Sequence, residues 1–160
     1  MLQKIIISLN YGINSQNHGG FNVLKRIITL VLMSVLVCVS AFAATPAPDN
    51  AAVYIISPAN GAVVTSPVTV KFGLKGMGVA PAGVDKKDTG HHHLLIDSEL
   101  PALNKAIGKD DKHLHFGGGQ TETTLLLTPG QHTLQLILGD KAHFPHKPPV
   151  VSEKITITVK

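Results

Sequence analysis

Short stretches of alternating apolar and polar residues run through the chain from residue 53 to its end. In residues 68–74 every second side chain is apolar, and Leu134, Leu136 and Leu138 repeat with the same period. A period of two is typical of a β-strand with one buried face. The pattern predicts about seven strands, over residues 53–56 with a continuation at 63–65, 68–74, 91–97, 113–116, 121–127, 132–138 and 152–159.

Turn-forming residues separate these strands, for example Asn60-Gly61 and the three glycines at 117–119. No stretch after residue 44 has the period of a long helix. We therefore expect an all-β fold, an immunoglobulin-like antiparallel β-sandwich of about seven strands over residues 53–160. Residues 44–52 are expected to be a linker. The chain has no Trp and one Cys, which excludes an antibody-type domain with its inter-sheet disulfide.

The first 43 residues follow a different pattern. Two basic residues at 25–26 precede an apolar run at 27–39 and a small-x-small site that ends at Ala43. This order is typical of a secretory signal peptide, here with a doubtful N-terminal extension before it. We expect the signal helix to be cleaved after Ala43 by the general export pathway. The mature chain, beginning at Ala44, is then periplasmic or secreted and has no membrane attachment.

The formal charge of +4 is unevenly distributed along the chain. Three basic residues and no acid precede Ala44, whereas the remainder has eleven Lys, ten Asp and Glu, and no Arg. A nearly neutral domain without Arg argues against a nucleic-acid partner. The single cysteine, Cys38, lies in the expected signal peptide. The mature domain is therefore expected to fold without a disulfide.

Histidine is the residue type that suggests a chemistry, because eight of the nine histidines follow residue 44. Successive strands of such a sandwich reverse direction, so the loops before residue 91, after residue 116 and after residue 138 share one end. A His-x-His strand presents two imidazoles on one face, and neutral imidazole suits zinc and copper. We expect a copper or zinc ion there, with candidate ligands His91, His93, His113, His115, His143 and His146.

Other residues near this end bear on the choice of metal. His92 points away from its two neighbours and is not expected to be a ligand. Met77 lies in the loop before residue 91, and its thioether would favour Cu(I), although loop packing is its ordinary role. Residues 117–119 would let the backbone approach closely. Taken singly, each histidine has an ordinary alternative role as a hydrogen-bonded surface residue.

Several segments resemble a known family: VYIISPANGAVVTSPVTVKFGLKGMGVAPAG, TGHHHLLID, HLHFGGGQTE, and PGQHTLQLILGD with PPVVSEKITITV. They are similar to the bacterial family catalogued as domain of unknown function 4399, over residues 53–159. The resemblance implies a small exported domain and carries no established activity. A weaker likeness links His113-Leu114-His115 to copper–zinc superoxide dismutase, but the cysteine pair and guiding arginine of that enzyme are missing.

Four functions are compatible with these features. The leading hypothesis is a non-enzymatic periplasmic module that binds copper or zinc. The alternative is an envelope interaction or adhesion module that binds a protein or a glycan through its loops. An enzyme is less favoured, because the serines lie in no nucleophile-elbow context and only a metal-based route remains. A pH sensor is the fourth, since clustered imidazoles titrate near neutrality.

Overall fold

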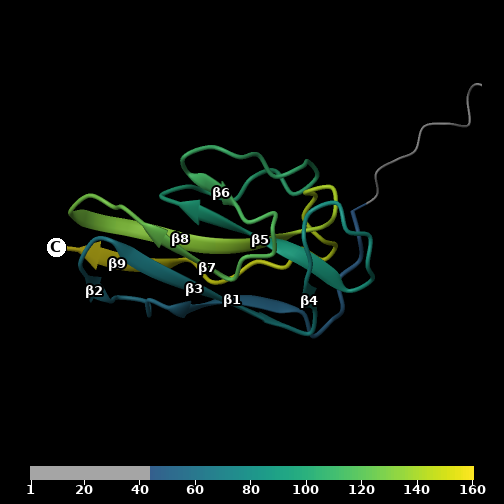
Figure 1. Ribbon diagram of the computed structural model, residues 1–160, viewed down its shortest axis with the longest axis horizontal. Helices are drawn as coiled ribbons and strands as arrows, with labels where there is room; N and C mark the ends of the chain where they lie inside the picture. Colours follow the sequence, from purple (N-terminus) through teal and green to yellow (C-terminus); the bar gives the residue numbers. More distant parts are fainter. Residues whose placement is uncertain (1–43) are drawn as a thin grey trace, which may run out of the picture. The chain divides into compact units, whose positions relative to one another are not determined.

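The computed structural model describes residues 44–160, which form two β-sheets and contain no helix (Figure 1). The predicted all-β sandwich is confirmed. Its strands are β1 (Ala52–Ser57), β2 (Val63–Val64), β3 (Val68–Lys75), β4 (Gly78–Val79), β5 (Thr89–Ile96), β6 (His113–His115), β7 (Glu122–Leu125), β8 (Gly130–Gly139) and β9 (Ile155–Val159). Within this part of the chain there is no helix that could cross a membrane. The expected signal helix lies outside the described residues.

The two sheets differ in size. The smaller sheet has the order β1-β3-β7 and is antiparallel throughout. The larger has the order β2-β9-β8-β5-β4, with β6 paired to β5 in addition. Its two short outer strands, β2 and β4, pair in parallel with their neighbours, and its other pairs are antiparallel. Of the nine strands, only β4 has no counterpart in the sequence prediction.

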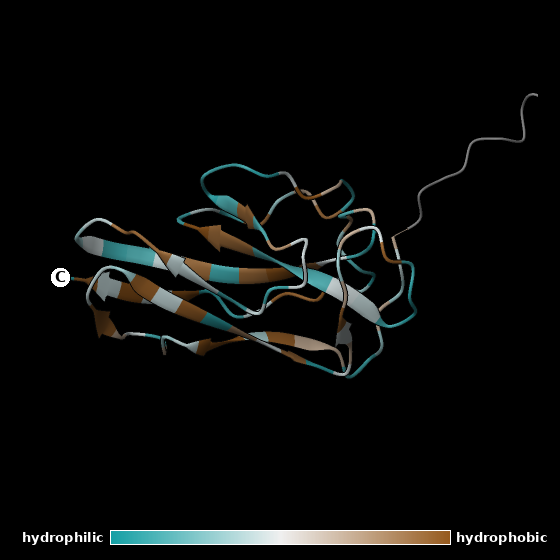
Figure 2. Cartoon of the chain, viewed as in Figure 1, coloured by the Kyte–Doolittle hydropathy of each residue, from teal (hydrophilic) through white to brown (hydrophobic). Residues whose placement is uncertain are grey.

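The main hydrophobic core fills the space between the sheets. Apolar and polar residues alternate along β3 (Figure 2), so that this strand turns one apolar face inward. Val70 and Phe72 of β3 pack in one cluster with Leu94 of β5 and Leu136 of β8, all of them buried. Fully burying a side chain of the size of Leu94 stabilises the fold by about 2 kcal/mol.

A second, smaller cluster lies on the opposite face of the larger sheet. It contains Leu95 of β5, Ile137 of β8 and Ile107, with Val151 packed against them. Leu95 and Leu94 are neighbours on one strand and therefore point to opposite faces. Both faces of β5 are thus covered, which explains why its residues are buried almost without interruption.

The segment expected to be a linker makes hydrogen bonds to the domain. The amide of Ala47 donates to the carbonyl of Lys147 at 3.1 Å, and the amide of Lys147 donates to the carbonyl of Thr45 at 3.0 Å. Pro46 and Lys147 form an isolated parallel bridge. The first described residues therefore lie against the loop that joins β8 to β9.

Candidate metal centre

Strand β5 supplies two of the histidines on the face of the larger sheet that points away from the main core. His91 and His93 alternate with His92 and Leu94, which point inward. The ring of His92 packs 5.2 Å from the ring of Phe72, measured between centroids. The prediction that His92 points away from its neighbours is thus confirmed.

Strand β6 supplies the third histidine because it pairs with β5 in the larger sheet. The register places His115 directly opposite His93. Residues opposite one another in an antiparallel pair have their Cβ atoms about 5 Å apart. The ring centroids of His93 and His115 are 5.0 Å apart.

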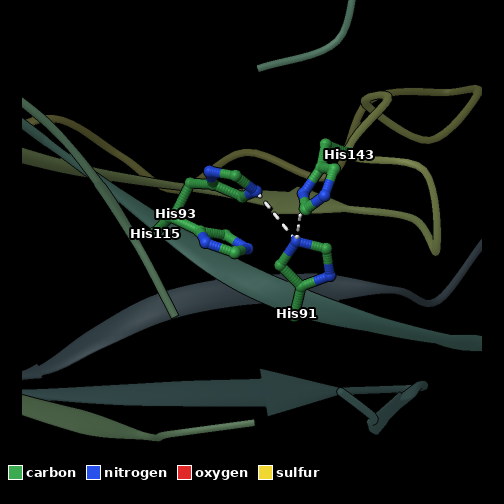
Figure 3. A group of neighbouring side chains, drawn as sticks. All are labelled: His91, His93, His115 and His143. Atoms are coloured by element: carbon green, nitrogen blue, oxygen red, sulfur yellow. Dashed lines mark hydrogen bonds between the residues drawn. The ribbon is translucent and has the colours of Figure 1, made fainter. Parts of the chain in front are cut away.

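The loop after β8 supplies the fourth histidine, His143. Its backbone has a φ of 67°, in the left-handed region that few residues other than glycine adopt. This conformation lies inside a tight turn in which the amide of His143 donates to the carbonyl of Asp140 at 2.9 Å. The turn directs the imidazole of His143 at that of His91 (Figure 3).

One nitrogen from each of these four rings lies within 4.8 Å of the others. Nε2 of His91 is 3.0 Å from Nε2 of His93 and 3.1 Å from Nδ1 of His143 (Figure 3). Around a tetrahedral zinc ion with bonds of about 2.0 to 2.1 Å, ligand nitrogens are separated by about 3.3 Å. The group His91, His93, His115 and His143 could therefore hold a metal ion with small movements of its rings.

Burial and neighbouring imidazoles lower the pKa of His91, His93 and His115, which favours the neutral form that binds metals. Burial, followed by the neighbouring rings of His143 and His115, lowers the pKa of His91 to about 4. Burial and the ring of His91 lower the pKa of His93 to about 3. The pKa of His115 is also lowered, first by its partial burial and then by His143.

Several ring nitrogens of this group have no hydrogen-bond partner among the described residues. Nδ1 of His91, Nδ1 of His93 and Nε2 of His115 are buried and make no hydrogen bond within the described residues. Each unsatisfied buried polar atom costs about 1 to 3 kcal/mol. An apolar patch would cover this face at lower cost, so stability alone does not account for four histidines here.

Two glycines provide the space that the rings occupy. A Cβ on Gly139 would lie 2.9 Å from Nε2 of His93 and 3.4 Å from Nε2 of His91. A Cβ on Gly117 would lie 2.3 Å from Cε1 of His115. The sequence pointed to the glycines at 117–119 as a place of close backbone approach, whereas the role of Gly139 needs the register between β5 and β8 to be seen.

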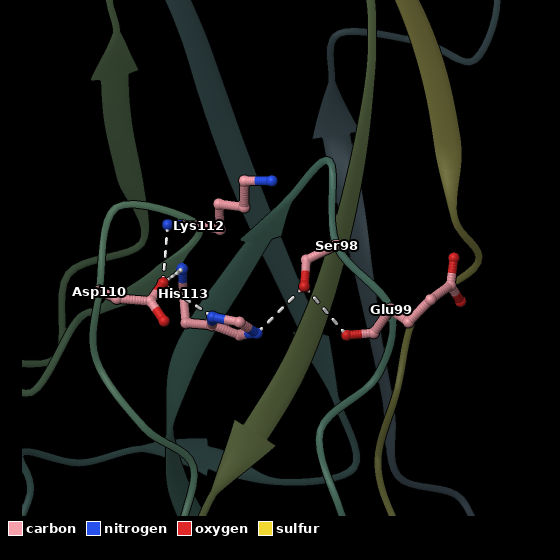
Figure 4. A network of polar contacts seen from close by, with 5 residues as sticks. All are labelled: Ser98, Glu99, Asp110, Lys112 and His113. Atoms are coloured by element: carbon pink, nitrogen blue, oxygen red, sulfur yellow. Dashed lines mark hydrogen bonds and ion pairs between the residues drawn. The ribbon is translucent and has the colours of Figure 1, made fainter.

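The other two candidate ligands lie outside this group. His113 is opposite Leu95, two residue pairs along the ladder from the pair of His93 and His115. Its Nδ1 lies 2.8 Å from Oδ1 of Asp110, and its Nε2 lies 3.2 Å from Oγ of Ser98 (Figure 4). Residues two apart on a strand are separated by about 6.6 Å, which is enough to place His113 in a different set of contacts.

His146 lies on the opposite side of β5. Its Nε2 is 2.8 Å from the position that a Cβ on Gly90 would take, and this position faces away from the side chain of His91. Its Nδ1 is 3.2 Å from the carbonyl oxygen of Thr45. The structure thus brings together four of the six predicted ligands, on the outer face of the larger sheet.

Asp140 is a residue of this region that the sequence did not single out. Its side chain is buried, and burial opposes its ionisation. Hydrogen bonds from Thr45 and from the amides of Ala142 and Phe144 outweigh that effect and lower its pKa. Its charge acts on His91 and on His146, where it opposes the lowering of both pKa values. No sequence motif marks it, because its partners are backbone amides and a distant threonine.

Fold and site together define an all-β sandwich domain with a histidine group that could hold a metal ion. The chain belongs to the family described as Domain of unknown function (DUF4399), whose sequence model matches residues 70–160 and so includes all four histidines. The resemblance stated from the sequence is thereby confirmed. Among curated proteins and among solved structures, no match to this chain was found.

Proposed function

We propose that this domain binds one copper or zinc ion through His91, His93, His115 and His143, and that it does so without catalysing a reaction. The observation that carries the proposal is the convergence of four ring nitrogens within 4.8 Å on one face of the sheet. Four protein donors complete a tetrahedral site and leave no open position for a substrate, which is the arrangement of non-catalytic zinc sites.

The donor set favours zinc or copper over other ions. Four neutral nitrogens suit these two metals, whereas calcium and magnesium require oxygen ligands. Met77 packs against the main hydrophobic core, and the group contains no sulfur donor. A set of nitrogens alone favours Zn(II) or Cu(II) over Cu(I), which prefers soft sulfur ligands.

The cellular setting that we propose is the periplasm or the cell exterior, reached through the expected signal peptide that ends at Ala43. The support for this is the basic–apolar–small-residue order of the first 43 residues. The alternative of an envelope interaction module that binds a protein or a glycan through its loops stays a prediction.

Metal titration of the purified protein tests the proposal. We expect Zn(II) or Cu(II) to bind with a 1:1 stoichiometry and a Kd below about 1 μM, measured in competition with a chelator. His115→Ala and His143→Ala should lose this binding, and both rings are only partly buried, so the variants should still fold. His132→Gln is the matched control, because His132 is bonded to Asp97 and lies outside the group. Equal binding by all three variants would overturn the proposal.

A further inference from the structure

The loop that carries His143 is organised around the carboxylate of Asp140. Oδ1 of Asp140 accepts hydrogen bonds from the amides of Ala142 at 2.9 Å and of Phe144 at 3.0 Å. The amide of Asp140 donates in turn to the carbonyl of Phe144 at 2.8 Å. The left-handed conformation of His143 costs of order 1 kcal/mol or more, and this turn holds the residue in it.

The other carboxylate oxygen of Asp140 contacts a segment that is distant in sequence. Oδ2 accepts a hydrogen bond from the hydroxyl of Thr45 at 2.8 Å and lies 3.4 Å from its amide nitrogen. We call residues 45–47 the N-terminal clasp. The carbonyl of Thr45 also accepts from the amide of Lys147 at 3.0 Å, and the amide of Ala47 donates to the carbonyl of Lys147 at 3.1 Å.

The clasp thus contacts the loop at two points, Asp140 and Lys147. His143 lies between these two attachment points. Displacing the clasp would remove two contacts from the buried carboxylate of Asp140, and a buried charge that loses its partners is strongly unfavourable. The clasp and the turn that carries His143 thus share the carboxylate of Asp140, the clasp through Oδ2 and the turn through Oδ1.

Charge gives a second connection between the clasp and the histidines. Four neutral imidazoles around a divalent ion leave a net charge of about +2 at a partly buried place. The carboxylate of Asp140 acts electrostatically on His91 without belonging to the converging group. The carboxylate of Asp140 would compensate part of the charge of the ion through this electrostatic interaction.

We infer that the N-terminal clasp belongs to the metal centre: docking of Thr45 on Asp140 and binding of a metal ion by the four histidines stabilise each other. This inference rests on the proposed function. Coupling between two equilibria is reciprocal. Metal binding must therefore raise the equilibrium constant for docking of the clasp by the same factor by which docking raises the affinity for the ion.

Purified wild-type protein and four variants test the coupling. Thr45→Val removes the hydroxyl of residue 45 at nearly constant shape, and Thr45→Ser keeps it. Asp140→Asn removes the charge of the carboxylate. Asp85→Asn is the control, because Asp85 forms an ion pair with Lys141 of the same loop but does not contact Asp140, Thr45 or the histidines. Zn(II) affinity is measured by chelator competition, and the ligand geometry is followed by the visible absorption of bound Co(II).

We expect Thr45→Val and Asp140→Asn to weaken Zn(II) binding about 10- to 100-fold and to change the Co(II) spectrum. Thr45→Ser should bind within about threefold of the wild type, as should Asp85→Asn. Hydrogen exchange supplies the reciprocal measurement. The amides of Ala47 and Lys147 should exchange at least tenfold more slowly when Zn(II) is bound, and Thr45→Val should reduce that protection.

The outcomes separate this inference from the proposed function. If the wild type binds Zn(II), His143→Ala abolishes binding, and Thr45→Val binds as the wild type does, the coupling is wrong and the proposed function stands. Unchanged exchange of Ala47 and Lys147 on Zn(II) binding also overturns the coupling alone. A wild-type protein that binds neither Zn(II) nor Cu(II) overturns both.

Discussion

The absence of a side chain at Gly139 makes room for the imidazole of His93. The two residues lie on adjacent strands of the larger sheet, and a Cβ on residue 139 would come within 2.9 Å of Nε2 of His93. Heavy atoms at that distance overlap, so the ring and an added methyl group cannot both keep their places. The converging geometry of the centre is therefore determined partly by a residue that contributes no ligand.

Replacing this glycine should damage the metal centre more than the fold. Gly139→Ala pushes the ring of His93 away from Nε2 of His91. We expect Zn(II) affinity to fall by at least tenfold and the free energy of unfolding to fall by about 1 to 3 kcal/mol, as for other overpacked sites. Gly108→Ala is the control, because a Cβ added at residue 108 would have no heavy atom within 4 Å outside its chain neighbours. Chelator competition and urea denaturation provide the two measurements, and unchanged affinity in Gly139→Ala would contradict the proposed geometry.

The inward-facing His92 should be dispensable for metal binding. Both of its ring nitrogens are buried without a hydrogen bond, although the backbone of Gln120 lies near the ring, which packs on Phe72 in the main core. His92→Leu removes two unsatisfied atoms and keeps an apolar contact with Phe72. We expect the unfolding free energy to rise by about 1 kcal/mol and Zn(II) affinity to stay within about threefold of the wild type. A loss of affinity comparable to that of His93→Ala would show that His92 has a part in the centre.

A pH-dependent contribution to stability is expected at the pair His132 and Asp97, which lies apart from the metal centre. The hydrogen bond that Nδ1 of His132 donates to the carboxylate of Asp97 raises the pKa of His132. Burial opposes ionisation of Asp97, but hydrogen bonds from the Thr133 amide and from His132 lower its pKa. The raised pKa of His132 contributes stability below its unfolded value of about 6.5, and this is lost as pH rises through the folded value. The lowered pKa of Asp97 contributes above about 3.9 and is lost as pH falls through the folded value.

The pair is therefore most stabilising between about pH 4 and pH 6.5. Asp97→Asn tests this, because asparagine tolerates the left-handed φ of 49° at this position and can still accept from the amide of Thr133. We expect the variant to lose up to about 1 kcal/mol at pH 5.5 and less at pH 8.5, since the pair is partly exposed. Urea denaturation at the two pH values gives the difference, and an equal loss at both would refute the titration argument.

How far the centre can be predicted from sequence differs between its residues. Strand periodicity predicts that His91 shares a face with His93 and that His113 shares a face with His115. That His115 and not His113 lies opposite His93 depends on the register between β5 and β6. Which face of β5 points to the core could not be read from the sequence, since residues 91–96 are buried on both sides and show no alternation of apolar and polar residues. The sequence predicts the histidines at the loop end of the sandwich, with the His-x-His pairs on strand faces. In the structure His91, His93 and His115 come from strands of the larger sheet, and only His143 comes from a loop.

The positions of His143 and Asp140 could not be predicted from local sequence patterns. The position of His143 depends on a turn built from backbone hydrogen bonds to Asp140 and on a left-handed φ, neither of which has a sequence signature here. The contact between Asp140 and Thr45 spans 95 positions of the chain. Contacts of that range depend on the complete topology, and no periodicity within a segment specifies them.

Metal binding should stabilise the domain, and the two histidines of β6 should differ in their effect. Because an ion that binds only the folded state stabilises it by mass action, Zn(II) at a hundredfold excess over Kd should add about 2.7 kcal/mol. For a domain of this size that corresponds to a rise in Tm of roughly 10 °C. His115→Ala should abolish this rise, because His115 belongs to the converging group. His113→Ala should keep the rise in Tm. His113 lies two residues from His115 on β6, and its ring is hydrogen-bonded to Asp110 and Ser98. Thermal denaturation with Zn(II) and with a chelator measures the effect, and equal shifts in the two variants would contradict the assignment of four ligands out of six candidates.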